Sequence, residues 1–206
     1  MSTFVSMIYT EIREKKVFQT IQEKLKLSLD EARYQHTLGV MYTAGCMAMA
    51  HQFDIKEAML AGILHDCAKC MTHEERLALC EQYGVPVTES ELENRALLHA
   101  KAGAILAKME YDITDIEILH AIAVHTTGAP DMNTLDKIIY IADYIEPGRD
   151  KAPNLERVRM LAYKDLDACM AQILYDTLNY LSSRGGHMDP MTKEAYEFYK
   201  EYRKES

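Results

Sequence analysis

The sequence predicts an all-α protein that forms a single domain, and three observations support this. Helix-start patterns recur along the chain, and the 9 Gly and 5 Pro cluster at breaks between apolar stretches. No segment alternates strictly between apolar and polar residues, as a half-buried strand would. A length of 206 residues suits one domain, and no repeat, low-complexity linker or shift in composition divides it.

Each expected helix begins at a residue that can cap it. The first five are expected from Ser28 to about His51, from Asp54, from Thr72 to Gly84, from Ser90 to about Met109, and from Thr114–Asp115. The later ones are the stretch LDKIIYIADYIE, which must end near Pro147, a short piece opened by Pro153, and a longer helix from about Asp165 to Ser183. Gly185–Gly186 should end that helix, and Pro190 suits the first turn of the last one.

We expect residues 1–27 to form a separate N-terminal helix, which packs on a body formed by residues 28–206. Its apolar residues, such as Ile8, Ile12 and Ile21, follow helical spacing only loosely. The same face could instead contact a partner.

The composition excludes several classes of protein. With 48% hydrophobic and 27% charged residues, the chain is neither disordered nor fibrous. A net charge of −9 argues against nucleic acid as a partner, and no long apolar run predicts a membrane span. The 5 cysteines do not form complete pairs, and the N-terminus lacks signal-peptide features. We expect a cytoplasmic protein, and the sequence leaves open whether it forms a homodimer.

Polar residues within apolar helical stretches are the clearest sign of function. His65–Asp66 lies in MLAGILHDCAK, where a buried carboxylate is costly unless it is paired or bound to metal. Similar settings hold four further residues: His36, His99, His125 and Asp143. Each histidine alone is more often a hydrogen-bonded core residue. Together, imidazoles and carboxylates are the ligands of Fe, Mn, Zn and similar divalent ions, and six suffice for two ions with Asp66 between them.

Basic residues close to this set are candidates for binding phosphate. Arg33 lies three residues before His36, Lys69 three after Asp66, and Arg149 shortly after Asp143.

The spacing of His36, His65–Asp66 and Asp143 resembles the metal-binding motif of the HD superfamily of phosphohydrolases. The strings RYQHTLGV, AGILHDCAK, LLHAKAGA, AVHTTGAPDM and IYIADYIEPGR resemble its YqeK-type family, the symmetrical bis(5'-nucleosyl)-tetraphosphatases. The resemblance covers about residues 28–200. It implies a helical bundle with two divalent metal ions, iron in that family, and symmetrical cleavage of diadenosine tetraphosphate into two ADP.

Carried over, the resemblance assigns metal ligation to His36, His65, Asp66, His99, His125 and Asp143, with Asp66 bridging. It assigns nucleotide phosphate to Arg149, and more weakly to Arg33, Lys69 and Thr126. The ligand His36 is also an expected substrate contact. Relatives carry Ile-His-Pro-x-Thr near the C-terminus, whereas this chain has Met188-Asp189-Pro190-Met191-Thr192. Asp189 and Thr192 are the corresponding contacts, and the base preference can differ.

The expected mechanism uses a hydroxide held between the metals, which attacks phosphorus in line with the leaving oxygen. Asp66 and Lys69 are the expected catalytic residues, and Mn, Co or Zn would also fit the ligands. Three alternatives stay open: an HD phosphohydrolase for a dNTP, a nucleoside monophosphate or a cyclic nucleotide; a non-catalytic nucleotide or metal sensor; and a helical interaction module.

Overall fold

The computed structural model describes residues 16–183 and 189–203, and every regular element in these two ranges is a helix. Residues 16–28 are helical and precede the labelled elements. In chain order the others are α2 (Glu31–Ala50), α3 (Ile55–Leu64), α4 (His73–Gln82), α5 (Glu89–Glu93), α6 (His99–Glu110), α7 (Ile116–Val124), α8 (Thr134–Ile145), α9 (Leu155–Ala162), α10 (Leu166–Ser183), α11 (Pro190–Tyr199) and the short 3₁₀ turn η1 (Lys200–Tyr202). The all-α prediction is confirmed.

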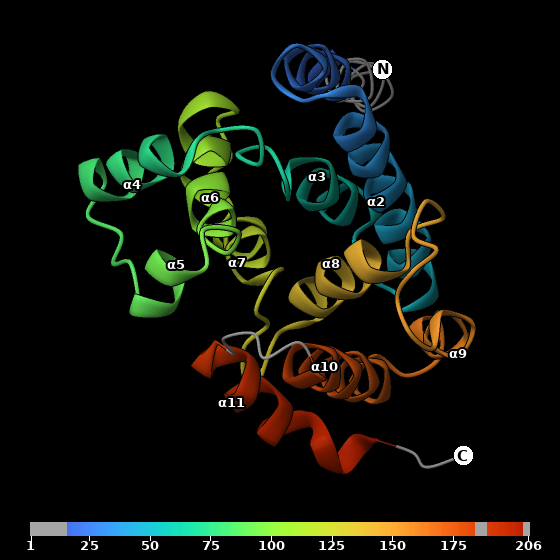
Figure 1. The fold of residues 1–206 in the computed structure, drawn as a ribbon. Coiled ribbons are helices and arrows are strands. Elements are labelled where there is room, and N and C mark those ends of the chain that lie inside the picture. Colours follow the sequence, from blue (N-terminus) through green and yellow to red (C-terminus); the bar gives the residue numbers. More distant parts are fainter. Residues whose placement is uncertain (1–15, 184–188, 204–206) are drawn as a thin grey trace, which may run out of the picture.

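Four helices form the centre of the molecule. α2, α3 and α8 pack against one another, α7 packs on α3 and α8, α6 packs on α7, and α10 packs on α8 (Figure 1). α8 is buried along most of its length because its apolar residues, among them Ile138, Ile141 and Ile145, contact neighbours on several sides. This arrangement brings the ends of four central helices and the start of α6 to one region.

Most expected helix starts are confirmed by the caps. Asp54 and Thr72 are the N-caps of α3 and α4, and Asp115, one residue after Thr114, is the N-cap of α7. Each of these side chains accepts a hydrogen bond from the first turn. Pro190 is the first residue of α11. Gly185–Gly186 lies outside the described residues.

Two expected boundaries are wrong. The cap of α2 is Asp30 rather than Ser28, because the Asp30 carboxylate accepts from the Arg33 amide. The single helix expected from Ser90 to Met109 is two helices, and Thr88 caps the first. The Asn94 side chain accepts from the Ala96 amide and ends that helix, which is the local competition that makes Asn a poor interior residue.

The described part of the N-terminal segment contacts the main core. Ile21 and Leu25 are buried and belong to the same cluster as residues of α2, α3 and α8. This helix runs to residue 28, and the start of the expected segment 1–27 lies outside the described residues.

A second, smaller apolar cluster lies beside α4 and α6. It contains Cys80, Leu98 and Ile105, with four partly buried neighbours, and it stands apart from the main core. Within residues 16–183 and 189–203, no helix combines the length and the apolar character needed to cross a bilayer.

Candidate metal centre

The structure brings together all six residues that the sequence singled out as metal ligands. They come from segments far apart in the chain and lie at or near the ends of the helices that carry them. In chain order they are His36 in α2, His65 and Asp66 directly after α3, His99 at the start of α6, His125 directly after α7, and Asp143 in the last turn of α8.

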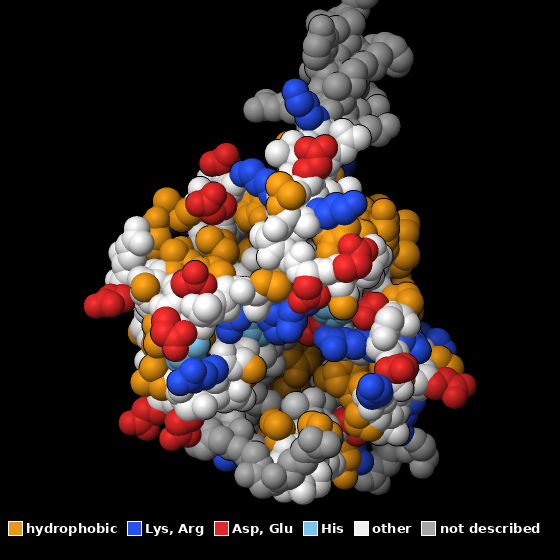
Figure 2. All heavy atoms as spheres, turned by 45° about the horizontal axis from the view of Figure 1, so that its top comes forward, with side chains coloured by type: hydrophobic (Ala, Val, Ile, Leu, Met, Phe, Trp, Pro, Cys, Tyr) orange, Lys and Arg blue, Asp and Glu red, His pale blue; other side chains and the backbone are white. Residues whose placement is uncertain are grey.

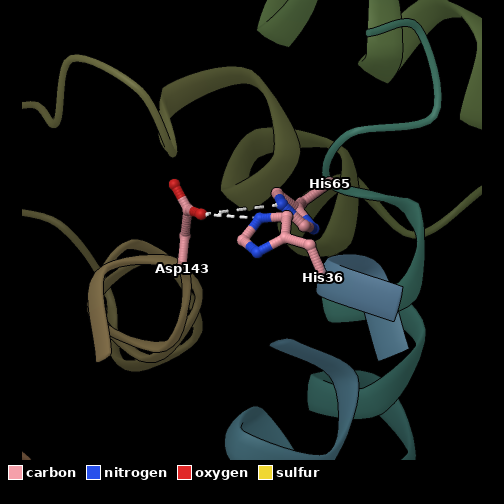
Figure 3. Close-up of side chains that lie close together, drawn as sticks. All are labelled: His36, His65 and Asp143. Carbon is pink, nitrogen blue, oxygen red and sulfur yellow. Dashed lines mark ion pairs between the residues drawn. The ribbon is translucent and has the colours of Figure 1, made fainter. Parts of the chain in front are cut away.

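One part of this cluster joins His36, His65 and Asp143, which point toward a common centre (Figure 3). Asp143 Oδ1 lies 3.0 Å from His36 Nε2 and 3.9 Å from His65 Nε2. The candidate ligand atoms of the three residues all lie within 4.8 Å of one another, so one ion could contact all three.

The other part is centred on Asp66. Its Oδ1 lies 2.9 Å from His99 Nε2 and 3.5 Å from His125 Nε2. Its Oδ2 lies 3.8 Å from His65 Nε2. His65, Asp66 and His125 form a second group of ligand atoms within 4.8 Å, so His65 belongs to both groups. The two oxygens of Asp66 face different histidines, as a bridging carboxylate requires.

Hydrogen bonds at Nδ1 hold each imidazole ring. In three of them Nδ1 donates to the carbonyl oxygen three residues earlier: His65 to Gly62, His99 to Ala96, and His125 to Ile122. His36 differs, because its Nδ1 donates to the carboxylate of Glu146 at 3.1 Å. A proton on Nδ1 leaves a lone pair on Nε2, and a second partner of this kind is usual for metal-bound histidine.

The donor set therefore fits a cation. Lone pairs on imidazole nitrogens face carboxylate oxygens, and His99 Nε2 lies 3.1 Å from His125 Nε2. Three buried atoms of the cluster, His36 Nε2, His65 Nε2 and Asp66 Oδ1, have close neighbours but no partner with hydrogen-bond geometry. Acceptors that converge in this way are stable only with protons or cations between them.

The electrostatics keep two of the histidines and both carboxylates in the forms that bind metal. Burial lowers the pKa of His65 and of His99 to about 4, so both rings are neutral at neutral pH. Burial alone would raise the pKa of Asp143, but the contacts with His36, His65 and Arg149 outweigh it and hold that pKa well below its usual range. The pKa of Asp66 is also held low, because the surrounding imidazoles outweigh its burial.

A pocket of about 530 Å³ opens onto this cluster. Its lining includes His36 and Asp66 together with three predicted phosphate contacts, Arg33, Lys69 and Arg149. Figure 2 shows Lys and Arg side chains around a hollow in which histidine side chains are visible. The cations gather here although the whole chain carries a net charge of −9.

The cations differ in how closely they approach the ligands. Lys69 Nζ lies 2.9 Å from His99 Nε2 and 3.3 Å from Asp66 Oδ1. Arg149 binds Asp143 twice, through the side-chain oxygen and through the backbone carbonyl at 2.9 Å. Arg33 instead pairs with Asp30 at 3.3 Å at the more exposed edge of the pocket.

The remaining predicted substrate contacts fall into two cases. Thr126 Oγ1 lies 3.3 Å from Nε2 of both His99 and His125, so it belongs to the cluster. Asp189 caps α11 by accepting from the Met191 amide at 2.8 Å, and Thr192 is buried in the same helix. No hydrogen bond or ion pair in the described part of the chain joins Asp189 or Thr192 to the histidines.

Two residues that support the cluster were missed from the sequence. Glu146 binds His36, and its only sequence signal is its place three residues after Asp143. Arg76 is buried, and its guanidinium donates to the carbonyl oxygens of Ala68, Lys69 and Arg95. It ties the segment after Asp66 to the segment that precedes α6.

Comparison with known proteins agrees with this geometry. The model of the HD domain family matches residues 33–148. Symmetrical bis(5'-nucleosyl)-tetraphosphatases of Halalkalibacterium halodurans and Bacillus subtilis are 38% and 39% identical, and each alignment covers 84% of this chain and 91% of the relative.

A solved structure is similar over nearly the whole fold. The crystal structure of an HD superfamily hydrolase from Clostridium acetobutylicum, described as involved in NAD metabolism, superposes with a TM-score of 0.87 at 38% identity. The match covers 90% of this chain and 98% of that one. The aligned HD region contains all six clustered residues, so this chain belongs to the HD-domain family and, within it, to the family of the symmetrical bis(5'-nucleosyl)-tetraphosphatases.

Proposed function

We propose that this protein is a metal-dependent phosphohydrolase that cleaves diadenosine tetraphosphate symmetrically into two ADP. The relatives that are 38–39% identical over most of both chains carry that activity in their names. The observation that carries the proposal is the convergence of four imidazole Nε2 atoms and two carboxylates below a pocket rich in cations.

The chain offers ligands for two ions. His36, His65 and Asp143 would hold one, and Asp66, His99 and His125 would hold the other, with the carboxylate of Asp66 between them. This mixed imidazole and carboxylate set suits iron, the metal expected from the resemblance, and also Mn, Co or Zn. When bound, such ions lower the pKa of water toward neutrality and neutralise charge on phosphoryl oxygens.

The chain's own cations would hold the polyphosphate. Arg149 presents a planar guanidinium that matches two phosphate oxygens, and its bonds to Asp143 hold it beside the ligands. Lys69 places a compact positive charge between Asp66 and His99, where it would stabilise charge that develops during cleavage. Thr126 can donate to an oxygen beside the same two histidines.

The test is a product analysis. Purified protein is incubated with diadenosine tetraphosphate and Fe²⁺ or Mn²⁺, and the nucleotides are separated by chromatography. ADP as the only product supports symmetrical cleavage. AMP plus ATP would overturn the cleavage position, and absence of turnover with metal verified as bound would overturn the substrate.

Asp66→Ala is the matching variant. It removes the carboxylate between the histidines, so we expect both bound metal and turnover to be lost. A folded Asp66→Ala protein that kept full metal content and full rate would exclude this centre as the active site.

A further inference from the structure

The carboxylate of Glu146 is the most buried acidic group beside the cluster that the proposed mechanism leaves unused. Its exposed fraction is 4%, and it stands directly after the last residue of α8. One oxygen, Oε1, accepts from His36 Nδ1 at 3.1 Å, and the other, Oε2, accepts from the Gly148 amide at 2.6 Å. Both oxygens are therefore partnered, as a buried carboxylate requires.

Two glycines leave room for this carboxylate. A Cβ atom on Gly39 would lie 2.5 Å from Glu146 Oε2, and one on Gly148 would lie 2.9 Å from Oε1. Any larger residue at either position must displace the carboxylate. Gly39 lies on α2 one turn after His36, so the space for Glu146 and the ring that it binds belong to the same helix.

The same residue anchors the turn that carries Arg149. The Arg149 amide donates to the Glu146 carbonyl at 2.9 Å, while the Glu146 side chain holds the Gly148 amide. Arg159 on α9 supports this turn from the other side through the carbonyls of Ile145, Glu146 and Arg149. Within these contacts, the Glu146 carboxylate links the turn directly to α2.

We propose that Glu146 is a positioning residue that orients His36 for metal binding and, through the same carboxylate, fixes the turn that places Arg149. The proposal rests on the function proposed above and adds to it that metal affinity and phosphate binding share one support. With Nδ1 held by Glu146, His36 directs Nε2 toward Asp143. Second partners of this kind typically change metal affinity about 10- to 100-fold.

Glu146→Gln is the first test variant. It keeps the size of the side chain, but one of the two donors, His36 Nδ1–H or Gly148 N–H, then faces an amide NH₂ group. We expect Mn²⁺ or Fe²⁺ affinity, measured by competition with a chromophoric chelator, to fall about 10- to 100-fold. At saturating metal, KM for diadenosine tetraphosphate should rise more than kcat falls, because Arg149 is less well placed.

Gly39→Ala is the second variant and leaves every ionisable group intact. Its methyl group would displace the carboxylate from His36, so metal affinity should fall in the same direction. Gly45→Ala is the matched control, because it makes the same change on the same helix and meets only the side chains of Met59 and Ile55. Glu81→Gln, on the exposed part of α4, controls for loss of a carboxylate.

The outcomes separate the two proposals. Loss of metal affinity in Glu146→Gln and Gly39→Ala, with both controls unchanged, supports the positioning role. Wild-type metal affinity and wild-type KM in either folded variant overturn it, even if the wild-type enzyme binds metal and releases ADP. A wild-type protein that binds no divalent metal overturns the proposed function itself.

Discussion

The two parts of the metal centre orient their histidines by different means. His65, His99 and His125 each donate Nδ1–H to the carbonyl three residues earlier, so a single turn of chain fixes each ring. His36 relies on Glu146, which lies 110 positions later in the sequence. The first arrangement forms with local structure, whereas the second exists only after α2 has packed against the end of α8. A metal centre can thus combine ligands that the local chain orients with one that the whole fold orients.

The largest expected difference between the two parts comes from removing the carboxylate that lies between them. In Asp66→Ala the group with His99 and His125 loses its carboxylate and His65 loses its neighbouring oxygen, so bound metal and turnover should both fall to background. In His36→Ala the group of Asp66, His99 and His125 is intact, so about one ion per chain should remain. Metal content measured by elemental analysis checks this. Equal losses in the two variants would contradict the division into two groups.

The neutral state of the buried rings of His65 and His99 predicts that the metal-free protein loses stability in acid. Because the pKa values of His65 and His99 are about 4 in the fold and 6.5 in the unfolded chain, the unfolded state binds more protons between these values. Stability contributed by these neutral rings is present above pH 6.5 and is lost as the pH falls toward 4, by up to about 3 kcal/mol per ring. Thermal unfolding in chelator at several pH values measures it.

His36 should act in the opposite sense. Its pKa is raised, since Asp143 and Glu146 outweigh its burial, so its contribution is present below pH 6.5 and is lost as the pH rises through the raised value. In His36→Ala the gain in stability as the pH falls from the raised pKa to 6.5 should therefore be absent, while the loss below pH 6.5 remains. A metal-free protein whose stability is flat between pH 6.5 and 4 would exclude neutral buried rings.

A smaller effect is expected from Arg76, which joins the segment after Asp66 to the segment before α6. Arg76→Met leaves three carbonyl oxygens without their donor and should cost about 2–3 kcal/mol in the free energy of unfolding. Arg76→Lys should recover part of this. Arg95→Met, which removes an exposed pair with Glu74, should change stability by less than about 1 kcal/mol. Denaturant unfolding gives both values, and equal losses would contradict the role of Arg76.

The smallest effect is expected at Thr126. Thr126→Val removes one hydroxyl beside two histidines and keeps the shape of the side chain. Loss of one hydrogen bond from an uncharged hydroxyl to an anionic phosphate oxygen should raise KM by about 10-fold, with metal content unchanged. Steady-state kinetics at saturating metal measure it, and a large loss of bound metal would show that Thr126 instead supports the ligands.

The sequence predicted what local chemistry determines. Helix caps at Asp54, Thr72 and Asp115 follow from side chains that bond within one turn. The six clustered residues could be named because carboxylates and imidazoles within apolar stretches need an explanation even before the fold is known.

The features that were missed depend on competition or on distant partners. The break at Asn94 was not foreseen, because helix periodicity continues through it and only the Asn94–Ala96 turn stops the helix. Glu146 could not be assigned a role, since its partner His36 lies on another helix. In the sequence Arg76 is one of several charged residues on a polar helix. Its role is visible only in the structure, where it donates to three carbonyl oxygens.

The small apolar cluster of Cys80, Leu98 and Ile105 has a kinetic consequence. Cys80 and Leu98 lie in the stretch of chain that connects Asp66 to His99, Ile105 lies on α6, and the cluster is apart from the main core. Small satellite clusters open more often than the core that they adjoin. Opening of this one would loosen α4 and α5 from α6 while α2, α7 and α8 stay packed. The amide hydrogens of α4 and α5 should then exchange with solvent faster than those of α2 and α8.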